Sequence, residues 1–510
     1  MKIQRTKNAA RNILFDGMLQ AMRMVVPFIM RTIVLHYLGI EFLGLGGLFR
    51  SILSFLNLAE LGVANAMVFS MYKPIAEDDR DTICALMKLY RTLYRIIGLF
   101  ILAVGLFLTP FLKNLIKGTT PDGVNLYVLY FMNLGITVIS YWLFAYKTSL
   151  LYAHQRRDIS SKVSLLVLPV QYGLQILVLV VFRSYYLYLA VQMCSQVATN
   201  VLTAWQVTRL YPGYSPRGDL PKERKLDIAK RVRDLFTSKF SYIISTSSDT
   251  LVISSFLGLS ALALFQNYFY IITSLRTMLD VIIGACIAGV GNSLITETRE
   301  KNFKDLQKLT VLYGWLMGVS SAMLLCMVQP FMTIWMGEEN LLALGMVVCF
   351  AVYFYLQGMN KLLNMFKDAA GIWRRDRMRP LTGALVNLSL NLLTVRWLGL
   401  YGVILSTVVS IVVVEIPWLL HNLFAEIFPH DYLALYLRSF FGFVGTALLG
   451  CAISWFLCGR LTLAPWPAFF VNAVISFLVP NLVFFAIYGR SRLFLDCVKQ
   501  IKRVIIRKKA

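Results

Sequence analysis

The sequence is dominated by long apolar stretches, each about the length needed to cross a membrane. An α-helix rises about 1.5 Å per residue, so about 20 apolar residues span the roughly 30 Å hydrocarbon core of a bilayer. With 58% hydrophobic residues, 15% charged residues and a mean hydropathy of +0.66, the chain is predicted to be an all-α polytopic membrane protein. Fourteen stretches are predicted to cross the membrane, with approximate bounds of 12–38, 42–71, 89–112, 124–152, 162–182, 184–209, 234–258, 261–294, 308–335, 341–369, 380–397, 400–422, 434–458 and 466–488.

The basic charge is distributed in a way that predicts topology and argues against a nucleic-acid partner. The net charge is +24, but most of the 50 Lys and Arg residues lie in the two termini and in every second loop. Basic loops stay in the cytoplasm, so both termini are predicted to be cytoplasmic. The basic excess also predicts affinity for anionic membrane lipids. The predicted cytoplasmic loops are 72–88, 153–161, 210–233, 295–307, 370–379 and 423–433.

The sequence has no motif for a metal, a disulfide or ATP hydrolysis. Its eight cysteines form no CxxC pair, its four histidines are dispersed, and no GxxxxGK[ST] motif occurs. We therefore predict no cofactor, and transport energy from substrate flow or from a gradient, with H⁺ and Na⁺ both open as the coupling ion. The basic start, MKIQRTKNAARN, has no convincing cleavage site after it and is predicted to open a retained first helix.

A loop with three prolines, 210–233, divides the predicted segments into six before it and eight after it. The octapeptide LGIEFLGL at 38–45 is echoed by LGLSALAL at 257–264, which favours duplicated halves with a site at their interface. We predict five regions: a six-helix bundle at 1–209, a basic linker at 210–233, a second six-helix bundle at 234–425, two additional helices at 426–489 and a basic tail at 490–510.

Three arginines, Arg23, Arg31 and Arg50, lie inside the first two segments, where lipid-facing helices carry none. Each costs about 2.5–3.5 kcal/mol at the bilayer centre unless it faces protein or water. In the first segment one helix face carries, within roughly an 80° arc, Asp16, Gln20, Arg23, Pro27 and Arg31. The pattern predicts the lining of a cationic cavity. The alternative is that some arginines extend to the membrane surface or pair with acidic residues, for which Asp16, Glu41 and Glu60 are available.

Further intramembrane polar residues fall into two predicted groups. Those predicted to line the cavity are Asp16, Gln20, Asn57, Asn267 and Lys361. Those predicted to couple an ion or to act in gating are Glu60, Asp249, Asp280 and Glu415. Arg276 is predicted to meet the other arginines across the cavity, although its spacing of four from Asp280 also allows a local ion pair. Glu415 precedes Pro417, which predicts a kink in that helix.

Several arginines in one cavity predict an anionic substrate. Guanidinium groups stay charged and bind phosphate through paired donors, so a phosphate or pyrophosphate head group is the natural match. A pump for cationic drugs would instead place carboxylates there. The connections on the other side of the membrane are short, the longest being 113–123, whereas an enzyme acting on extracellular sugars would need a sizeable external loop.

The chain resembles the Wzx-type polysaccharide flippases of the multidrug/oligosaccharidyl-lipid/polysaccharide (MOP) exporter superfamily. The opening signature LGIEFLGLGGLFRSILSFLNLAELGVANAMVFSMYKPIAEDDRDTICALMKLYRTLY at 38–94 carries the likeness. Further similar blocks are DTLVISSFLGLSALALFQNYFYI at 249–271, GVGNSLITE at 289–297, QPFMTIWMGEE at 329–339 and DAAGIWRRDRMRPLTGALVNLSLNLLTVRWLGLYGVILSTVVS at 368–410. The likeness covers most of residues 10–420.

This resemblance implies two pseudo-twofold-related six-helix bundles around a central cavity, with two further helices here. It implies a protein of the bacterial inner membrane that transports undecaprenyl-pyrophosphate-linked oligosaccharide units to the outer leaflet by alternating access. The units would serve O-antigen, capsule or another exopolysaccharide, and no enzymatic activity is implied. A polysaccharide polymerase and a chain-length regulator are the implied protein partners. The related lipid II flippases carry cavity arginines on their first, second and eighth helices, which implies pyrophosphate binding by Arg23, Arg50 and Arg276, with Arg31 as an addition or an alternative to Arg23. The open alternatives are a drug or metabolite antiporter of the same superfamily, a lipid II flippase and a membrane polysaccharide polymerase.

Overall fold

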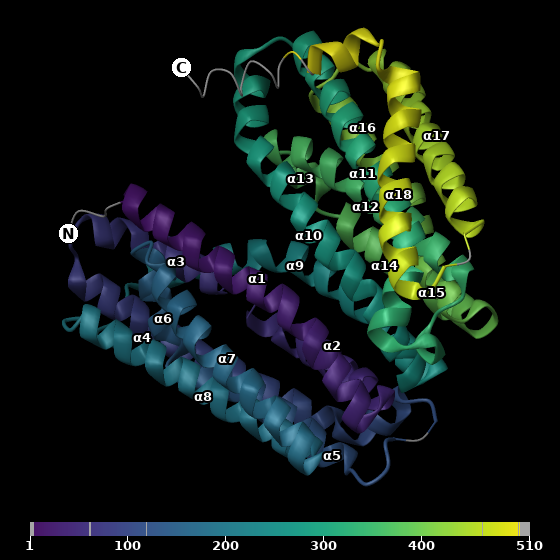
Figure 1. The fold of residues 1–510 in the computed structure, drawn as a ribbon. Coiled ribbons are helices and arrows are strands. Elements are labelled where there is room, and N and C mark those ends of the chain that lie inside the picture. Colours follow the sequence, from purple (N-terminus) through teal and green to yellow (C-terminus); the bar gives the residue numbers. More distant parts are fainter. Residues whose placement is uncertain (1–4, 61–62, 119, 462, 498, 500–510) are drawn as a thin grey trace. The chain divides into compact units, whose positions relative to one another are not determined.

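The computed structural model describes residues 5–60, 63–118, 120–461, 463–497 and 499, and the elements in these ranges are helices (Figure 1). The first part of the chain contains α1 (Arg5–Leu38), α2 (Ile40–Leu56), η1 (Asn57–Glu60), α3 (Val63–Ala76), α4 (Arg80–Leu108), η2 (Thr109–Leu115), α5 (Leu126–Trp142), α6 (Ala145–Ala153), α7 (Arg157–Phe182), α8 (Tyr185–Leu210) and α9 (Lys222–Leu257). The second part contains α10 (Leu259–Thr296), α11 (Arg299–Met336), η3 (Glu338–Asn340), α12 (Leu344–Ala369), α13 (Trp373–Asp376), α14 (Arg379–Leu398), α15 (Leu400–Ser410), η4 (Ile411–Glu415), α16 (Ile416–Glu426), α17 (Tyr432–Gly459) and α18 (Pro465–Tyr488).

Each of the fourteen predicted segments falls on one helix or on consecutive helices. Among the described residues, ten helices are long and apolar enough to cross a membrane, or up to eleven if the bent pair α5–α6 counts as one span. The predicted segments outside this set fall on α2–η1–α3, α8 and α9. The polytopic all-α class predicted from the sequence is therefore confirmed. The second half of the predicted linker, from Lys222, forms the first part of α9.

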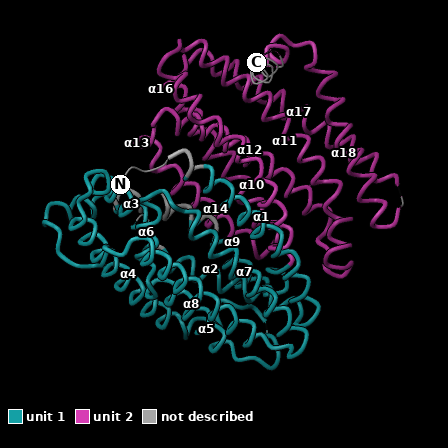
Figure 2. The backbone as a smooth tube through the Cα atoms, turned by 60° about the vertical axis from the view of Figure 1, so that its left-hand side comes forward, with its two compact units in different colours: residues 1–263 teal, residues 264–510 magenta. Residues whose placement is uncertain are grey.

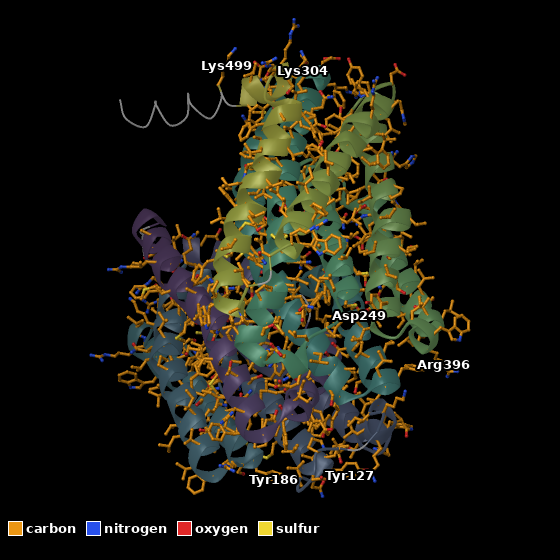
Figure 3. The ribbon with its side chains drawn as sticks, turned by 45° about the vertical axis from the view of Figure 1, so that its right-hand side comes forward. Tyr127, Tyr186, Asp249, Lys304, Arg396 and Lys499 are labelled. Carbon is orange, nitrogen blue, oxygen red and sulfur yellow. The ribbon has the colours of Figure 1, made fainter. Side chains whose placement is uncertain are left out.

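By its packing the chain forms two compact units, residues 1–263 and 264–510, coloured separately in Figure 2. In unit 1, α7 packs against α1 and α8, and α2 packs against α9. Gly44 permits a close approach in this unit, because a Cβ atom there would collide with the carbonyl oxygen of Leu259. Asn125 caps α5 and its backbone N–H donates to the Tyr186 hydroxyl at 2.6 Å, so the starts of α5 and α8 lie together (Figure 3).

Unit 2 is built around α11, which packs against α12, α17 and α18. Val311, Phe443, Phe484 and Phe494 form a buried apolar cluster between these elements. Trp315 borders the cluster and donates its indole N–H to Asn481 at 3.0 Å. In this unit Lys304 and Lys499 lie at one end, and Arg396 lies toward the other (Figure 3).

Two spans are interrupted rather than continuous. The axes of α5 and α6 differ by 50°, and Phe144 between them has a left-handed backbone with φ of 57°. In unit 2 a π-helical turn, η4, joins α15 to α16 and ends at Glu415, two residues before Pro417. The missing amide of proline disrupts the helical ladder, so the predicted kink corresponds here to a π-helical turn.

Candidate functional site

A polar cavity of about 300 Å³ lies inside unit 1. It contains three residues predicted from the sequence to line a cavity, Asp16, Gln20 and Arg23, all from α1. The remaining walls come from Leu19 of α1 and from α6, α7 and α8. Most of these wall residues are hydroxyl or amide side chains, and the lining is completed by Leu19, Thr148, Tyr152, Arg157, Ser160, Ser161, Ser164, Thr199, Asn200 and Thr203.

Asp16 is held at the edge of this cavity by residues from the start of α7. Ser161 hydrogen-bonds to the Asp16 carboxylate, and Arg157 Nε lies 3.7 Å from Asp16 Oδ2. The Arg157 guanidinium also lies over the Tyr152 ring, 5.1 Å from its centroid. Because Arg157 and Asp16 are both partly exposed, this ion pair is weak and the guanidinium keeps donors for a ligand.

A hydrogen-bonded clamp, formed by the Asn12 side chain and the backbone of Gln155 and Asp158, fixes α1 to the start of α7. Asn12 donates its amide to the Gln155 carbonyl at 3.0 Å and accepts from the Asp158 N–H at 2.8 Å. The Asp158 carboxylate is buried and accepts from Arg156 at 2.9 Å and from Lys162 at 3.1 Å. Burial alone would raise the pKa of Asp158, but these two cationic donors outweigh it and hold that pKa below its usual value. The clamp therefore fixes the register of Asp16, Gln20 and Arg23 relative to α7.

Arg31 and Arg50 lie near a pair of tyrosines in unit 1. The charges of Arg23 and Arg50 both act on the hydroxyl of Tyr172 in α7, and those of Arg50 and Arg31 both act on Tyr188 in α8. The Arg50 side chain is exposed and that of Arg31 is half-buried. Unit 1 therefore brings the three predicted arginines within electrostatic range of the two tyrosines.

Asn57 and Glu60 belong to a second polar cluster of unit 1. The Tyr141 hydroxyl donates to Asn57 Oδ1 at 3.1 Å, and the Tyr94 hydroxyl donates to Glu60 Oε1 at 2.9 Å. The Tyr90 hydroxyl in turn donates to that of Tyr94. Asp249, a further ion-coupling prediction, lies half-buried in α9 (Figure 3).

In unit 2, Arg276 and Asp280 lie one turn apart on α10. Arg276 Nη1 donates to the Tyr353 hydroxyl of α12 at 3.3 Å. One carboxylate oxygen of Asp280, Oδ1, is buried without a hydrogen-bond partner. Both charges act on Tyr313 of α11. Asn267, predicted to line the cavity, is completely buried, and its amide lies 3.8 Å from the Met336 sulfur.

Glu415 takes part in a buried ionic network at the start of α14. Arg379 donates from Nε and Nη2 to both carboxylate oxygens of Asp376, at 2.7 and 2.9 Å, and from Nη2 to Asn364 at 2.7 Å. Its Nη1 lies 3.5 Å from Glu415 Oε2, which also accepts from Asn360. Arg379 and Asp376 are 4% and 3% exposed, so the centre of the network is closed to solvent. Lys361, one residue from Asn360, is exposed.

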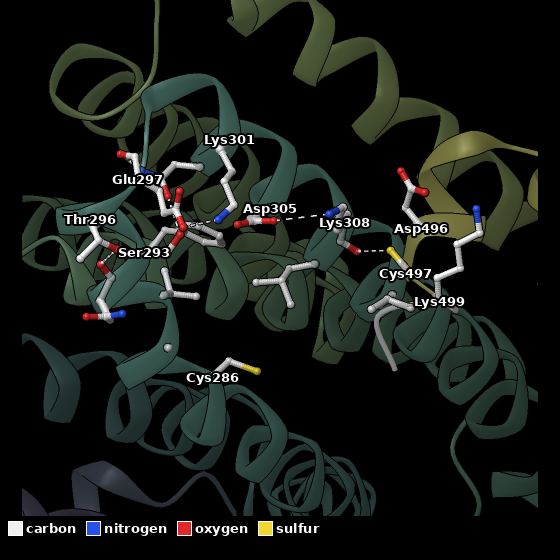
Figure 4. Close-up of a pocket in the computed structure, with 17 residues that line it drawn as sticks. Cys286, Ser293, Thr296, Glu297, Lys301, Asp305, Lys308, Asp496, Cys497 and Lys499 are labelled. Carbon is white, nitrogen blue, oxygen red and sulfur yellow. Dashed lines mark hydrogen bonds and ion pairs between the residues drawn. The ribbon is translucent and has the colours of Figure 1, made fainter. Parts of the chain in front are cut away.

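A larger cavity of about 890 Å³ in unit 2 is bounded by α10, α11, Phe366 and the residues after α18 (Figure 4). Two of its three lining lysines lie beside acids: Lys301 pairs with Glu297, and Lys308 lies 3.6 Å from Asp305. The lining as a whole holds three acids, Glu297, Asp305 and Asp496, for the three lysines. Cys497 Sγ lies 3.9 Å from the Lys308 carbonyl oxygen. Because its charges are balanced locally, this cavity is a weaker candidate for an anion than the cavity of unit 1.

The structure thus groups some predicted residues and separates others. Asp16, Gln20 and Arg23 share one cavity, and Arg31 and Arg50 lie near the tyrosines of α7 and α8. Asn57 and Glu60 lie in a separate cluster, and the predicted meeting of Arg276 with the unit 1 arginines stays a prediction. Sequence reasoning missed Arg157, Tyr172 and Tyr188. Arg157 belongs to a predicted basic loop, which indicates topology and not a binding site. Tyr172 and Tyr188 lie in largely apolar stretches, where a tyrosine is not unusual, so the sequence did not mark these three residues as part of a site.

Comparison with known proteins gives structural but not sequence relatives. No protein-family model and no curated protein matches the chain. A solved structure of the lipid II flippase MurJ in an inward closed conformation is similar over 94% of this chain and 99% of its own, with a TM-score of 0.65 and 14% identity. An inward-facing multidrug resistance MATE family transporter of the MOP superfamily is similar over 77% of this chain and 92% of its own, with a TM-score of 0.60 and 14% identity. A MATE transporter of Vibrio cholerae is similar over 82% of this chain and 97% of its own, with a TM-score of 0.53 and 14% identity.

The chain has the fold of these transporters. Together with the number of long apolar helices, this likeness makes it a multi-pass membrane protein. At 14% identity the likeness concerns the fold alone, and the substrate has to be argued from the residues of this chain.

Proposed function

We propose that this chain is a flippase that carries undecaprenyl-pyrophosphate-linked oligosaccharide units from the cytoplasmic to the outer leaflet of a bacterial inner membrane by alternating access. Both termini are cytoplasmic in this proposal. The polysaccharide polymerase and the chain-length regulator that use the flipped units are its proposed protein partners.

The observation that carries the proposal is the series of cationic positions along α1 in unit 1. Arg23 borders the 300 Å³ cavity, and Arg31 lies eight residues further along the helix, within range of Tyr188. At 1.5 Å per residue the two are about 12 Å apart along the axis. Arg50 acts on the tyrosines near both arginines. Such a series can bind a diphosphate at successive depths, because each guanidinium offers paired donors.

The hydroxyl and amide walls of the same cavity suit the sugar part of such a substrate. Thr148, Thr199, Asn200 and Ser164 offer donors and acceptors beside Arg23. A volume of 300 Å³ corresponds to roughly ten waters, which is the scale of a small saccharide rather than of a whole repeat unit. The protein breaks no bond in this mechanism. It lowers the desolvation barrier that a charged, hydrated head group meets in hydrocarbon.

The test is replacement of Arg23, Arg50 and Arg276 by alanine, one at a time, in a strain that depends on this protein. Each change should abolish surface polysaccharide while the protein still inserts in the membrane. Lysine replacements should keep part of the function if charge alone matters and little if paired donors matter. Arg460→Ala, at the far end of α17, is the control and should be silent. Wild-type polymer in all three alanine variants would refute the proposed site.

The structural likeness to MurJ supports a second candidate, a lipid II flippase, whose substrate also carries a pyrophosphate. Identification of the lipid-linked sugar that accumulates on deletion separates the two candidates. Accumulated peptidoglycan precursor would favour the second. The drug-antiporter alternative receives less support, because the arginines would repel cationic drugs. Flux of such a compound through the purified protein would reverse this judgement.

A further inference from the structure

The outward surface of unit 1 carries four basic side chains at the end predicted to be cytoplasmic. Arg91 and Arg95 lie on α4, Lys147 on α6 and Arg209 at the last turn of α8. These helices are neighbours, since α6 packs against both α4 and α8 (Figure 1). We call these four residues the basic outer surface.

Large apolar side chains surround these cations. Ile96 and Leu99 on α4, Phe144 at the helix break and Trp205 on α8 are exposed. The Lys147 ammonium lies 5.5 Å from the centre of the Phe144 ring, and the Arg209 guanidinium lies 5.6 Å from the centre of the Trp205 ring. Exposed apolar and aromatic groups in a polytopic protein face the bilayer, with tryptophan favoured at headgroup depth. The basic outer surface therefore faces lipid.

Lys147 is placed there by the break between α5 and α6. Trp142, the last residue of α5, donates its indole N–H to the Arg95 carbonyl at 3.2 Å, and the backbone then turns through the left-handed Phe144. One turn into α6, Lys147 Nζ donates to the Thr208 hydroxyl of α8 at 2.7 Å. An ammonium has three donors, so two remain after this bond.

No acid balances this charge within the part of the chain that the structure describes. The Lys147 ammonium has a hydrogen bond to Thr208 and a ring contact with Phe144, and the Arg209 guanidinium has a ring contact with Trp205. Among the described residues, none of Lys147, Arg209, Arg91 and Arg95 forms an ion pair. A half-buried cation facing lipid without an acidic partner is unfavourable. An external anion at this depth would supply the missing charge, and the anions at this depth are phosphates of the inner leaflet.

We propose that the basic outer surface binds the phosphate of an anionic phospholipid from the surrounding bilayer. Lys147 and Arg209 contact the phosphate, with Phe144 and Trp205 beside the glycerol and the first acyl carbons. Arg91 and Arg95 add to the local positive potential. The ligand is a bilayer lipid, so this inference does not depend on which substrate the cavity carries.

The test measures binding of phosphatidylglycerol and phosphatidylcholine to the purified full-length protein by native mass spectrometry and by thermal unfolding in detergent. The wild type should bind and be stabilised by phosphatidylglycerol in preference to phosphatidylcholine. The double variant Lys147→Gln/Arg209→Gln should lose roughly five-fold in apparent affinity for each removed charge. Arg460→Gln is the matched control, because Arg460 also lies over a ring, that of Phe456, at 4.8 Å. It should bind as the wild type does.

Lys147→Arg guards against a folding defect, since it keeps the charge and should keep the preference for phosphatidylglycerol. Unchanged binding in the double variant, or equal binding of the two lipids by the wild type, would overturn the proposal. The proposal would also be overturned if the wild type bound undecaprenyl phosphate in preference to phosphatidylglycerol at equal concentration and the double variant lost this preference. That result would assign the surface to the carrier lipid instead.

Discussion

Arginines inside the two units have very different surroundings. In unit 2, Arg379 is buried and three of its nitrogens meet two carboxylates and an amide, at Asp376, Glu415 and Asn364. In unit 1, Arg23 borders a polar cavity, and the exposed Arg50 lies near Tyr172 and Tyr188. A guanidinium saturated by internal partners has no donors left for a ligand, whereas one that faces hydroxyls and open volume does.

The difference teaches that an intramembrane or juxtamembrane arginine does not by itself mark a binding site. The network around Arg379 joins α12, α13, α14 and η4, so it fixes the π-helical turn that carries Glu415. Glu415 therefore has a structural explanation, and its predicted role in ion coupling has to be tested against that explanation. In unit 1, Asp16, the acid on the same helix face as Arg23, is engaged by Arg157 and Ser161.

The largest effect is expected from Arg379→Ala. Removal of Arg379 takes the bidentate cation from Asp376, leaving it only Lys367 at 3.5 Å, and takes the cation that lies beside Glu415. Breaking this buried ion pair should lower the free energy of unfolding by about 3–5 kcal/mol. Chemical unfolding of the purified protein, followed by tryptophan fluorescence, measures this. Arg50→Ala is the matched control and should stay within about 0.5 kcal/mol of the wild type, because Arg50 is exposed. Equal losses in the two variants would remove the distinction between the units.

A smaller loss is expected in unit 1 from Asn12→Ala. The change deletes two hydrogen bonds, to Gln155 and from Asp158, and should cost about 1–3 kcal/mol. Because the clamp sets the register of α1, hydrogen exchange should accelerate in the first turns of α1 and α7 and stay unchanged in unit 2. Asn481→Ala, which removes the Trp315 bond in unit 2, should show the opposite pattern. Faster exchange across the whole chain in both variants would contradict the assignment.

Asp16→Asn should change binding more than stability. Its ion pair with Arg157 is partly exposed at 3.7 Å, so its loss should cost at most about 1 kcal/mol. Asp16 is the acid among the residues that line the cavity, and its removal should strengthen binding of inorganic pyrophosphate about three- to ten-fold. This corresponds to about 1 kcal/mol, the repulsion between two like unit charges about 4 Å apart in a water-like dielectric. Calorimetric titration measures this, with Asp305→Asn, in the charge-balanced cavity of unit 2, as the control. Weaker binding in Asp16→Asn would show that Asp16 orients Arg157 for the ligand instead.

The sequence allows the helices to be predicted because apolar length is a sufficient signal for a membrane-spanning helix. It does not reveal the break at Phe144, because neither glycine nor proline lies at the break and the run from Leu126 to Ala153 is predominantly apolar on both sides of it. The π-helical turn before Pro417 was partly predictable, since proline signals a disrupted ladder but not its form.

The candidate site was predictable only where charge is rare. Arg23, Arg31 and Arg50 are conspicuous within apolar stretches, and the helical arc places Asp16 and Gln20 beside Arg23. Arg157 and Arg379 lie in predicted basic loops, where an arginine indicates only the orientation of the chain in the membrane. The sequence pattern therefore cannot show that Arg157 lines a cavity whereas Arg379 is buried in an ionic network. Only tertiary packing distinguishes them: Arg157 pairs loosely with Asp16, and Arg379 pairs tightly with Asp376.

The smallest expected effect is a pH dependence of unit 1 that arises from His154. Its ring is buried against Tyr211, with ring centres 4.5 Å apart, and its Nδ1 lies 2.9 Å from the Leu150 carbonyl oxygen. Burial lowers the pKa of His154 below 6.5, although the Leu150 carbonyl and Asp78 oppose this shift. The unfolded chain therefore binds the proton more readily than the folded one. The stability that the neutral ring contributes is complete above the unfolded pKa of about 6.5 and is lost as the pH falls through that value toward the folded pKa.

Thermal unfolding between pH 7.5 and 5 should show this loss in the wild type. His154→Gln should flatten the profile, and His421→Gln, at an exposed position on α16, should leave it unchanged. A profile that keeps its slope in His154→Gln would assign the pH dependence to other groups.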